Sequence, residues 1–178
     1  MIETLISSKT RVKLLLKFFL NSSTKSYLRN LESEFGESTN AIRLELNKFE
    51  EAGMLSSKFE GNKKIYQANT KHPLFNDINS IVLKYTGIDW IVDYLVKKLG
   101  DVQKVYLTGS FARGNNGDEI ELIIVGNIDV AFMNELCEKI KRKIQKEIKF
   151  TVENHQITVD KLIKNSSENY LMLWERLE

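Results

Sequence analysis

The first half of the chain carries the apolar spacing of three consecutive helices. Over residues 12–20, apolar side chains recur three or four positions apart, while lysines occupy the positions between them. A second helix follows from about Ser26, and Gly36 would end it. Ser38 or Thr39 can cap a third helix that ends near Gly53. The buried stripe of this third helix would consist of Ile42, Leu46 and Phe49.

Two runs of alternating apolar and polar residues come after the third helix, with Gly61 and Asn62 between them. A Gly-Asn pair in this position predicts a tight hairpin. Helix, turn, helix and hairpin, in that order, are the pattern of a winged helix-turn-helix. We therefore expect such a domain over residues 1–72, followed by a connecting helix or linker over residues 73–87.

The second half alternates strands with helices, which is typical of an α/β domain. An amphipathic helix is predicted over residues 88–99, followed by a buried strand that leads into the turn Gly109-Ser110. A second strand, a helix, a third strand and a helical tail over residues 159–177 would complete a domain that spans residues 88–178. The expected fold class is α+β, with an N-terminal winged helix-turn-helix and a C-terminal α/β domain that has a small mixed sheet.

Composition and charge narrow the possible functions. Hydrophobic residues make up 42% of the chain and charged residues 28%, which suits packed domains with a charged surface. Cys137 is the only cysteine, so no internal disulfide can form and a cytoplasmic setting is expected. No apolar run reaches the ~20 residues of a membrane helix. Residues 1–86 hold 13 Lys and Arg against 9 Asp and Glu, so an anionic partner would meet the first half.

The third predicted helix has residues that can contact DNA. In a winged helix-turn-helix, this helix lies in the major groove, and hairpin lysines meet phosphates. Asn and Arg side chains can each form two hydrogen bonds with a base edge. The alternative is a solvated helix face in a domain that binds another protein. The candidate DNA contacts are Ser38, Thr39, Asn40, Arg43, Asn47 and Lys48 on the helix, and Lys58, Lys63 and Lys64 on the hairpin.

Residues 27–75 resemble the winged-helix domain of ArsR-like bacterial transcriptional regulators. The resemblance rests on "EEAGML", a Gly-Asn wing and "ANTKHPLF", in that order. It implies a cytoplasmic, usually dimeric, DNA-binding protein. Metal-sensing relatives use cysteine or histidine clusters, whereas this chain has only His72 and His155, far apart in sequence. Metal sensing is therefore not expected.

The stretch "GSFARGNNGDEIELIIVG" resembles the minimal nucleotidyltransferases, and the resemblance covers roughly residues 104–152. In that family the glycine turn holds the triphosphate, and two aspartates on the following strand bind two magnesium ions. Residues two apart on a strand share one face, where carboxylate oxygens can hold hard divalent cations. The resemblance implies phosphate or nucleotide binding by Gly109, Ser110 and Arg113, and catalysis and metal binding by Glu119 and Glu121.

This chain departs from the family pattern at the acids. Both are glutamates rather than aspartates, Asp118 stands where the family has serine, and no clear third acid follows. Paired with the winged helix, "LTGSFARG", "KIKRKI" and "LMLW" resemble regulators fused to a degenerate nucleotidyltransferase domain, in which only Glu121 tends to have a counterpart. Catalysis, nucleotide binding without turnover, and a scaffold or dimerisation role are all compatible with the sequence.

The sequence thus predicts a DNA-binding transcriptional regulator whose nucleotidyltransferase-like domain is non-catalytic and serves sensing or dimerisation. Its expected partners are double-stranded DNA and a second copy of itself, with a nucleotide as a possible ligand. The alternative is a Mg-dependent nucleotidyltransferase that acts on a protein or small-molecule acceptor. Magnesium and a nucleoside triphosphate are expected only in that case. A third hypothesis is an antitoxin-like partner of a toxin protein.

Overall fold

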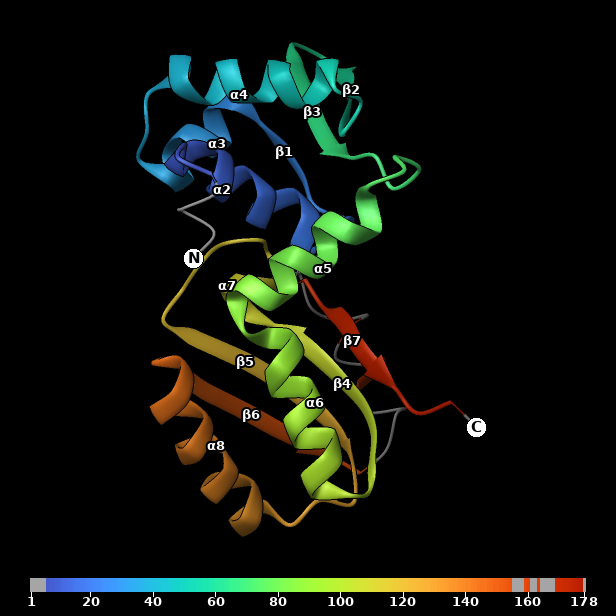
Figure 1. Cartoon of the computed structure of the whole chain (residues 1–178). Coiled ribbons are helices and arrows are strands. Elements are labelled where there is room, and N and C mark those ends of the chain that lie inside the picture. The colour runs from blue at the N-terminus through green and yellow to red at the C-terminus, as the bar shows by residue number, and fades with distance from the viewer. Residues whose placement is uncertain (1–5, 155–158, 161–162, 164–168, 178) are drawn as a thin grey trace. The chain divides into compact units, whose positions relative to one another are not determined.

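The computed structural model describes residues 6–154, 159–160, 163 and 169–177, and it divides into two compact units, Met1–Tyr85 and Thr86–Glu178 (Figure 1). Each unit has its own sheet. A three-stranded sheet with the order β1-β3-β2 lies in unit 1, and a four-stranded sheet with the order β6-β5-β4-β7 lies in unit 2. The fold is α+β.

The helices of unit 1 are α2 (Lys9–Leu15), η1 (Leu16–Leu20), α3 (Leu28–Phe35), α4 (Thr39–Glu51) and α5 (Phe75–Thr86), the last of which ends one residue into unit 2. The Ser38 hydroxyl caps α4 by accepting from the Ala41 amide, as predicted. Ile42, Leu46 and Phe49 of α4 are buried, which confirms the predicted stripe. Helix α3 ends at Gly36, whose left-handed backbone (φ 62°) suits glycine.

The first helix differs from its prediction in two respects. It begins at Lys9 rather than Val12, and its second half, η1, is a π-helix. All five residues of η1, Leu16, Lys17, Phe18, Phe19 and Leu20, are buried.

The sheet of unit 1 contains the predicted hairpin and one strand that was not predicted. Strands β2 (Leu55–Glu60) and β3 (Lys63–Ala68) form the hairpin. Strand β1 (Lys25–Tyr27) adds to the other edge of β3, where the sequence analysis placed the start of a helix. Three residues are too few to show an alternating pattern, so only the pairing reveals β1.

The sheet of unit 2 consists of β4 (Val102–Thr108), β5 (Glu119–Gly126), β6 (Glu147–Glu153) and β7 (Leu171–Glu175). Strands β5 and β6 are parallel, and the other pairs are antiparallel, so the sheet is mixed, as expected. Helices α6 (Ile88–Leu99) and α8 (Val130–Ile144) lie together on one face of this sheet (Figure 1).

The predicted helical tail over residues 159–177 is wrong at its C-terminal end. Residues 171–175 form β7, which pairs with β4. The "LMLWE" run has no helical period, and its backbone hydrogen bonds are satisfied by the open edge of β4. Part of the predicted tail, like the first five residues, lies outside the described residues. No helix in the described part of the chain has the length and apolarity needed to cross a membrane.

Candidate functional site

Strand β5 divides its side chains between the two faces of its sheet. Ile120, Leu122 and Ile124 are buried on the face that carries α6 and α8. Glu119 and Glu121 lie on the other face, because successive strand residues point in opposite directions. Glu119 is exposed and Glu121 is half-buried. The two carboxylates predicted from the sequence are therefore neighbours at the accessible end of one face, since Ile123 and Val125 farther along that face are buried.

The turn after β4 lies directly against the second of these carboxylates. Gly109 begins the four-residue helix α7 (Gly109–Ala112) with a left-handed backbone, φ 67°. A Cβ atom at residue 109 would overlap the carboxylate of Glu121. Glycine is needed here for two reasons: its backbone conformation, and the space that the Glu121 side chain fills.

Three side chains form a row across the sheet at this level. Glu121 pairs in register with Thr108 of β4 on one side and with Lys149 of β6 on the other. Residues that are paired across strands share a face, so Thr108 and Lys149 flank Glu121. This row lines a groove of about 340 Å³, together with Thr151 and Tyr170.

Lys149 neutralises the first carboxylate. Its Nζ atom lies 2.7 Å from Oε2 of Glu119, and both side chains are exposed at the surface. The hydrogen bond to Glu119 raises the pKa of Lys149 above its ordinary value, and the charges of Glu119, Glu121 and Glu147 act in the same direction. Lys149 is therefore fully charged at neutral pH.

The remaining residues predicted at the turn occupy different positions. Ser110 is half-buried, and its hydroxyl faces Gly117 in the loop before β5. Arg113 is exposed at the end of α7 and is absent from the groove lining. The loop is held by Lys146, whose Nζ donates to the carbonyl of Gly117 at 2.6 Å. The structure thus brings Gly109, Glu121 and Lys149 together but leaves Arg113 at the rim of this region.

The residues around the two carboxylates do not complete a two-metal site. Glu119 and Glu121 offer oxygen ligands of the kind that Mg²⁺ prefers. Within the described residues, no group of three or more His, Cys, Asp or Glu side chains could hold a metal ion. At the register position beside Glu121, where a third acid would complete a two-metal site, the chain has Lys149. A positive charge there opposes a second cation.

A second groove, of about 670 Å³, lies in unit 1 between α4 and the hairpin. It brings together four of the predicted DNA contacts, Arg43, Asn47, Lys63 and Lys64. Tyr27 and Arg29 also line it, although they are not among the DNA contacts predicted from the sequence. Among the other predicted contacts, Ser38, Asn40, Lys48 and Lys58 are exposed and Thr39 is half-exposed, and none of them lines the groove.

Several of these basic residues form ion pairs. Lys64 pairs with Glu50 at 2.6 Å, and Lys58 pairs with Glu60 at the same distance. Lys48 lies 3.5 Å from Glu45. Arg43 and Lys63 form no ion pair within the described part of the chain, and Lys63 lies over the Tyr27 ring at 4.6 Å. Arg29 also lines the groove and forms no ion pair within the described residues, so the uncompensated positive charge of this groove belongs to Arg29, Arg43 and Lys63.

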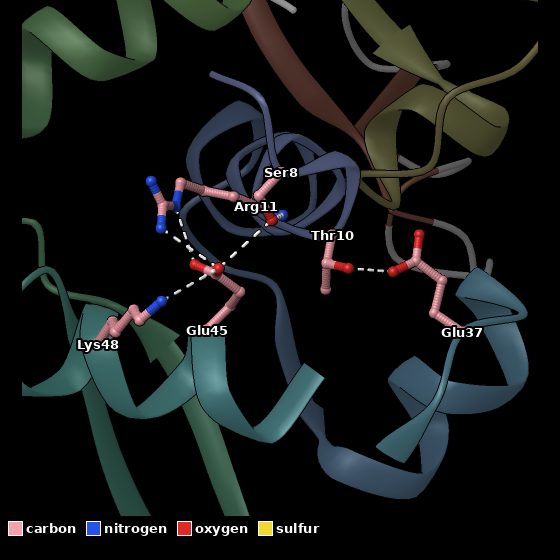
Figure 2. A network of polar contacts seen from close by, with 6 residues as sticks. All are labelled: Ser8, Thr10, Arg11, Glu37, Glu45 and Lys48. Atoms are coloured by element: carbon pink, nitrogen blue, oxygen red, sulfur yellow. Dashed lines mark hydrogen bonds and ion pairs between the residues drawn. The ribbon is translucent and has the colours of Figure 1, made fainter. Parts of the chain in front are cut away.

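Helix α4 is anchored to the N-terminal helix through the buried Glu45. This carboxylate accepts from Nε of Arg11 at 2.8 Å and from the Ser8 hydroxyl at 3.3 Å (Figure 2). Thr10 and Glu37 form a second polar contact beside it (Figure 2). Burial alone would raise the pKa of Glu45, but the hydrogen bonds and charges of Arg11 and Lys48 outweigh it and hold that pKa below its ordinary value.

The comparison with protein families bears on unit 2. A model of the nucleotidyltransferase domain family matches residues 88–176, which contain the Gly109 turn, both glutamates and Lys149. The chain belongs to this family. The glycine turn and the acidic strand, which the sequence predicts to hold phosphate and metal, both lie in the matched range. They contact each other through Gly109 and Glu121.

Relatives of this nucleotidyltransferase domain include a putative protein adenylyltransferase of Methanocaldococcus jannaschii. It is 32% identical over 77 residues, which are 42% of this chain and 77% of that protein. A solved mutant of the MntA–HpeT toxin–antitoxin pair is 16% identical over 50% of this chain and 72% of that chain, with a TM-score of 0.41. A possible transcriptional regulator for arsenical resistance is 23% identical over 53% of this chain and 88% of that chain, with a TM-score of 0.31. TM-scores this low do not bear on function.

Proposed function

We propose that this protein is a nucleotidyltransferase that moves a nucleotidyl group from a nucleoside triphosphate to an acceptor hydroxyl, with a protein as the favoured acceptor class. The observation that carries the proposal is the contact between the Gly109 turn and Glu121, with Glu119 beside it on the same strand face. The family match and the relative named a putative protein adenylyltransferase support this alternative better than the regulator that the sequence analysis placed first.

The roles follow from the turn at Gly109 and the acidic strand beside it. The backbone amides at Gly109 and Ser110 would receive phosphate oxygens, since amides at a tight turn form an anion-binding concavity. Glu119 and Glu121 would hold a magnesium ion, which supplies charge stabilisation to the phosphoryl oxygens when bound. The acceptor oxygen forms a bond to the α-phosphorus while the bond from that phosphorus to the bridging oxygen breaks. Pyrophosphate leaves, and the acceptor proton passes to solvent.

Transfer can be measured with ATP labelled in its α-phosphate and a lysate of candidate acceptors. Wild-type protein is expected to label an acceptor, and Glu121→Gln is expected to lower the rate by about 100-fold, because metal-held charge is worth several kcal/mol in such reactions. Glu135→Gln is the matched control, since Glu135 is an exposed glutamate on α8, outside the groove. Absence of labelling by the wild type with any nucleoside triphosphate would overturn the proposal.

Unit 1 supports a second candidate function, which is binding of double-stranded DNA through a winged helix-turn-helix like that of ArsR-like regulators. The observation in its favour is the convergence of Arg43, Asn47 and Lys63 on one groove. Arg43 and Asn47 are exposed on α4, so they are free to meet base edges. Homodimerisation, cytoplasmic localisation and the predicted domain boundaries are part of this proposal.

A gel-shift titration at low salt tests the second candidate. Arg43→Ala is expected to weaken binding by about tenfold, as is typical for loss of an arginine that contacts a base. Arg142→Ala, an exposed arginine on α8 of the other unit, is the control. If the wild-type protein does not shift the DNA upstream of its own gene, this second function is ruled out.

A further inference from the structure

The groove of unit 2 carries a positive charge where a two-metal site would need another negative one. Lys149 stands beside Glu121 in the strand register and donates a hydrogen bond to Glu119. Lys149 lines the groove, whereas Glu119 is absent from its lining. Glu147, which pairs in register with Glu119, is itself neutralised by Lys141 at 3.0 Å. The negative charge available to a cation is thus concentrated on Glu121.

We propose that Lys149 takes the place of a second divalent cation and binds the triphosphate directly. On nucleotide binding, its ammonium group leaves Oε2 of Glu119 and pairs with a phosphate oxygen. This exchange frees the Glu119 carboxylate to join Glu121 as a ligand for a single Mg²⁺ ion. The inference rests on the proposed function, because it names how that site recognises its substrate.

Three properties of Lys149 suit this role. Its side chain is 59% exposed, so the ammonium group can reach a ligand that enters the groove. A lysine has a flexible four-carbon stem and three donors, so changing partner costs little. The exposed pair with Glu119 is also weak, because water and salt screen the attraction between exposed charges. A triphosphate carries several negative charges close together, so it attracts the ammonium group more strongly than a single carboxylate does.

The inference predicts nucleotide binding without a divalent cation. Binding is measured by calorimetric titration with an ATP analogue that has a methylene bridge between its α- and β-phosphates. The titration is done once with EDTA, which removes divalent cations, and once with Mg²⁺. Wild-type protein is expected to bind in EDTA, and Lys149→Gln is expected to weaken that binding by about tenfold, whereas Lys149→Arg retains most of it. Lys139→Gln is the control, since Lys139 is an exposed lysine of α8 outside the groove.

The partner exchange supplies a second readout. Glu119→Gln releases Lys149 from its ion pair, so this variant is expected to bind the analogue several-fold more tightly in EDTA. A purely structural role for the Lys149–Glu119 pair would not move binding in that direction. A Lys149→Gln variant that binds as tightly as the wild type in EDTA would overturn the inference, as would wild-type binding that requires a divalent cation.

The two proposals fail separately. If the wild type binds nucleotide in EDTA through Lys149 but labels no acceptor, the transfer reaction is wrong and the role of Lys149 stands. If transfer occurs but all nucleotide binding depends on the divalent cation, the transfer reaction stands and the role of Lys149 is wrong. A wild type that binds no nucleotide under either condition overturns both.

Discussion

The carboxylate of Glu121 lies against the backbone of Gly109, in the space that a side chain at residue 109 would fill. These residues are twelve positions apart, on β5 and at the end of β4, and the pairing of Thr108 with Glu121 brings them together. The turn and the acid are therefore one structural unit. A side chain added at residue 109 would have to displace the Glu121 carboxylate.

Gly109→Ala is expected to displace the Glu121 side chain and to lower nucleotide transfer by at least about tenfold. The added methyl group would overlap the carboxylate, and a left-handed backbone disfavours alanine by about 1 kcal/mol. Gly100→Ala is the matched control, because Gly100 has φ 76° and open space where the Cβ would lie. Both variants should lose similar stability in urea, but only Gly109→Ala should lose transfer. Equal transfer by the two variants would contradict the contact.

Glu45→Gln is expected to lower the free energy of unfolding of unit 1 by about 1–3 kcal/mol, since a neutral amide replaces the buried carboxylate and is a weaker partner for Arg11. Glu45 accepts from Arg11 and Ser8, and its side chain is only 9% exposed. Glu51→Gln, an exposed glutamate on the same helix, should change stability by less than about 0.5 kcal/mol. Urea unfolding followed by circular dichroism measures both, and equal midpoints would contradict a stabilising role for the network.

The same network predicts a loss of stability in acid. The pKa of Glu45 in the folded protein is lowered below its ordinary value of 4.5, so the folded state favours the charged carboxylate. Its contribution is complete above pH 4.5 and is lost as the pH falls through the folded pKa. Thermal unfolding between pH 6 and pH 3 should therefore show a steeper decline for the wild type than for Glu45→Gln. Parallel declines would show that other carboxylates account for the acid sensitivity.

Cys137 is expected to react slowly with thiol reagents. Burial raises the pKa of its thiol to about 11, and the charge of Glu138 acts in the same direction. At pH 8 the thiolate fraction is then on the order of a thousandth, and the thiolate is the reactive form. A colourimetric disulfide reagent should modify the native protein at least about 100-fold more slowly than the urea-unfolded protein. A fast native reaction would mean that the Cys137 region of α8 opens readily.

The local elements could be predicted because each depends on neighbours in sequence. The helix at residues 88–99 has the bounds of α6, and the hairpin around Gly61 and Asn62 forms β2 and β3. Short or unpatterned segments could not be predicted in this way. β1 and β7 are strands only because an open edge of β3 or β4 accepts their backbone hydrogen bonds.

The candidate site shows the same division between sequence and tertiary structure. The alternation of β5 by itself placed Glu119 and Glu121 on one face, and the spacing of α4 by itself turned Arg43 and Asn47 outward. The parallel register of β5 with β6 decided that Lys149 stands beside Glu121 and pairs with Glu119. Residues 121 and 149 are separated by a whole helix, and no local periodicity fixes a register across such a distance. The pattern of acids alone suggested a metal site. Strand pairing, which is set by the packing of the entire sheet, is the physical reason that Lys149 stands at this site as well.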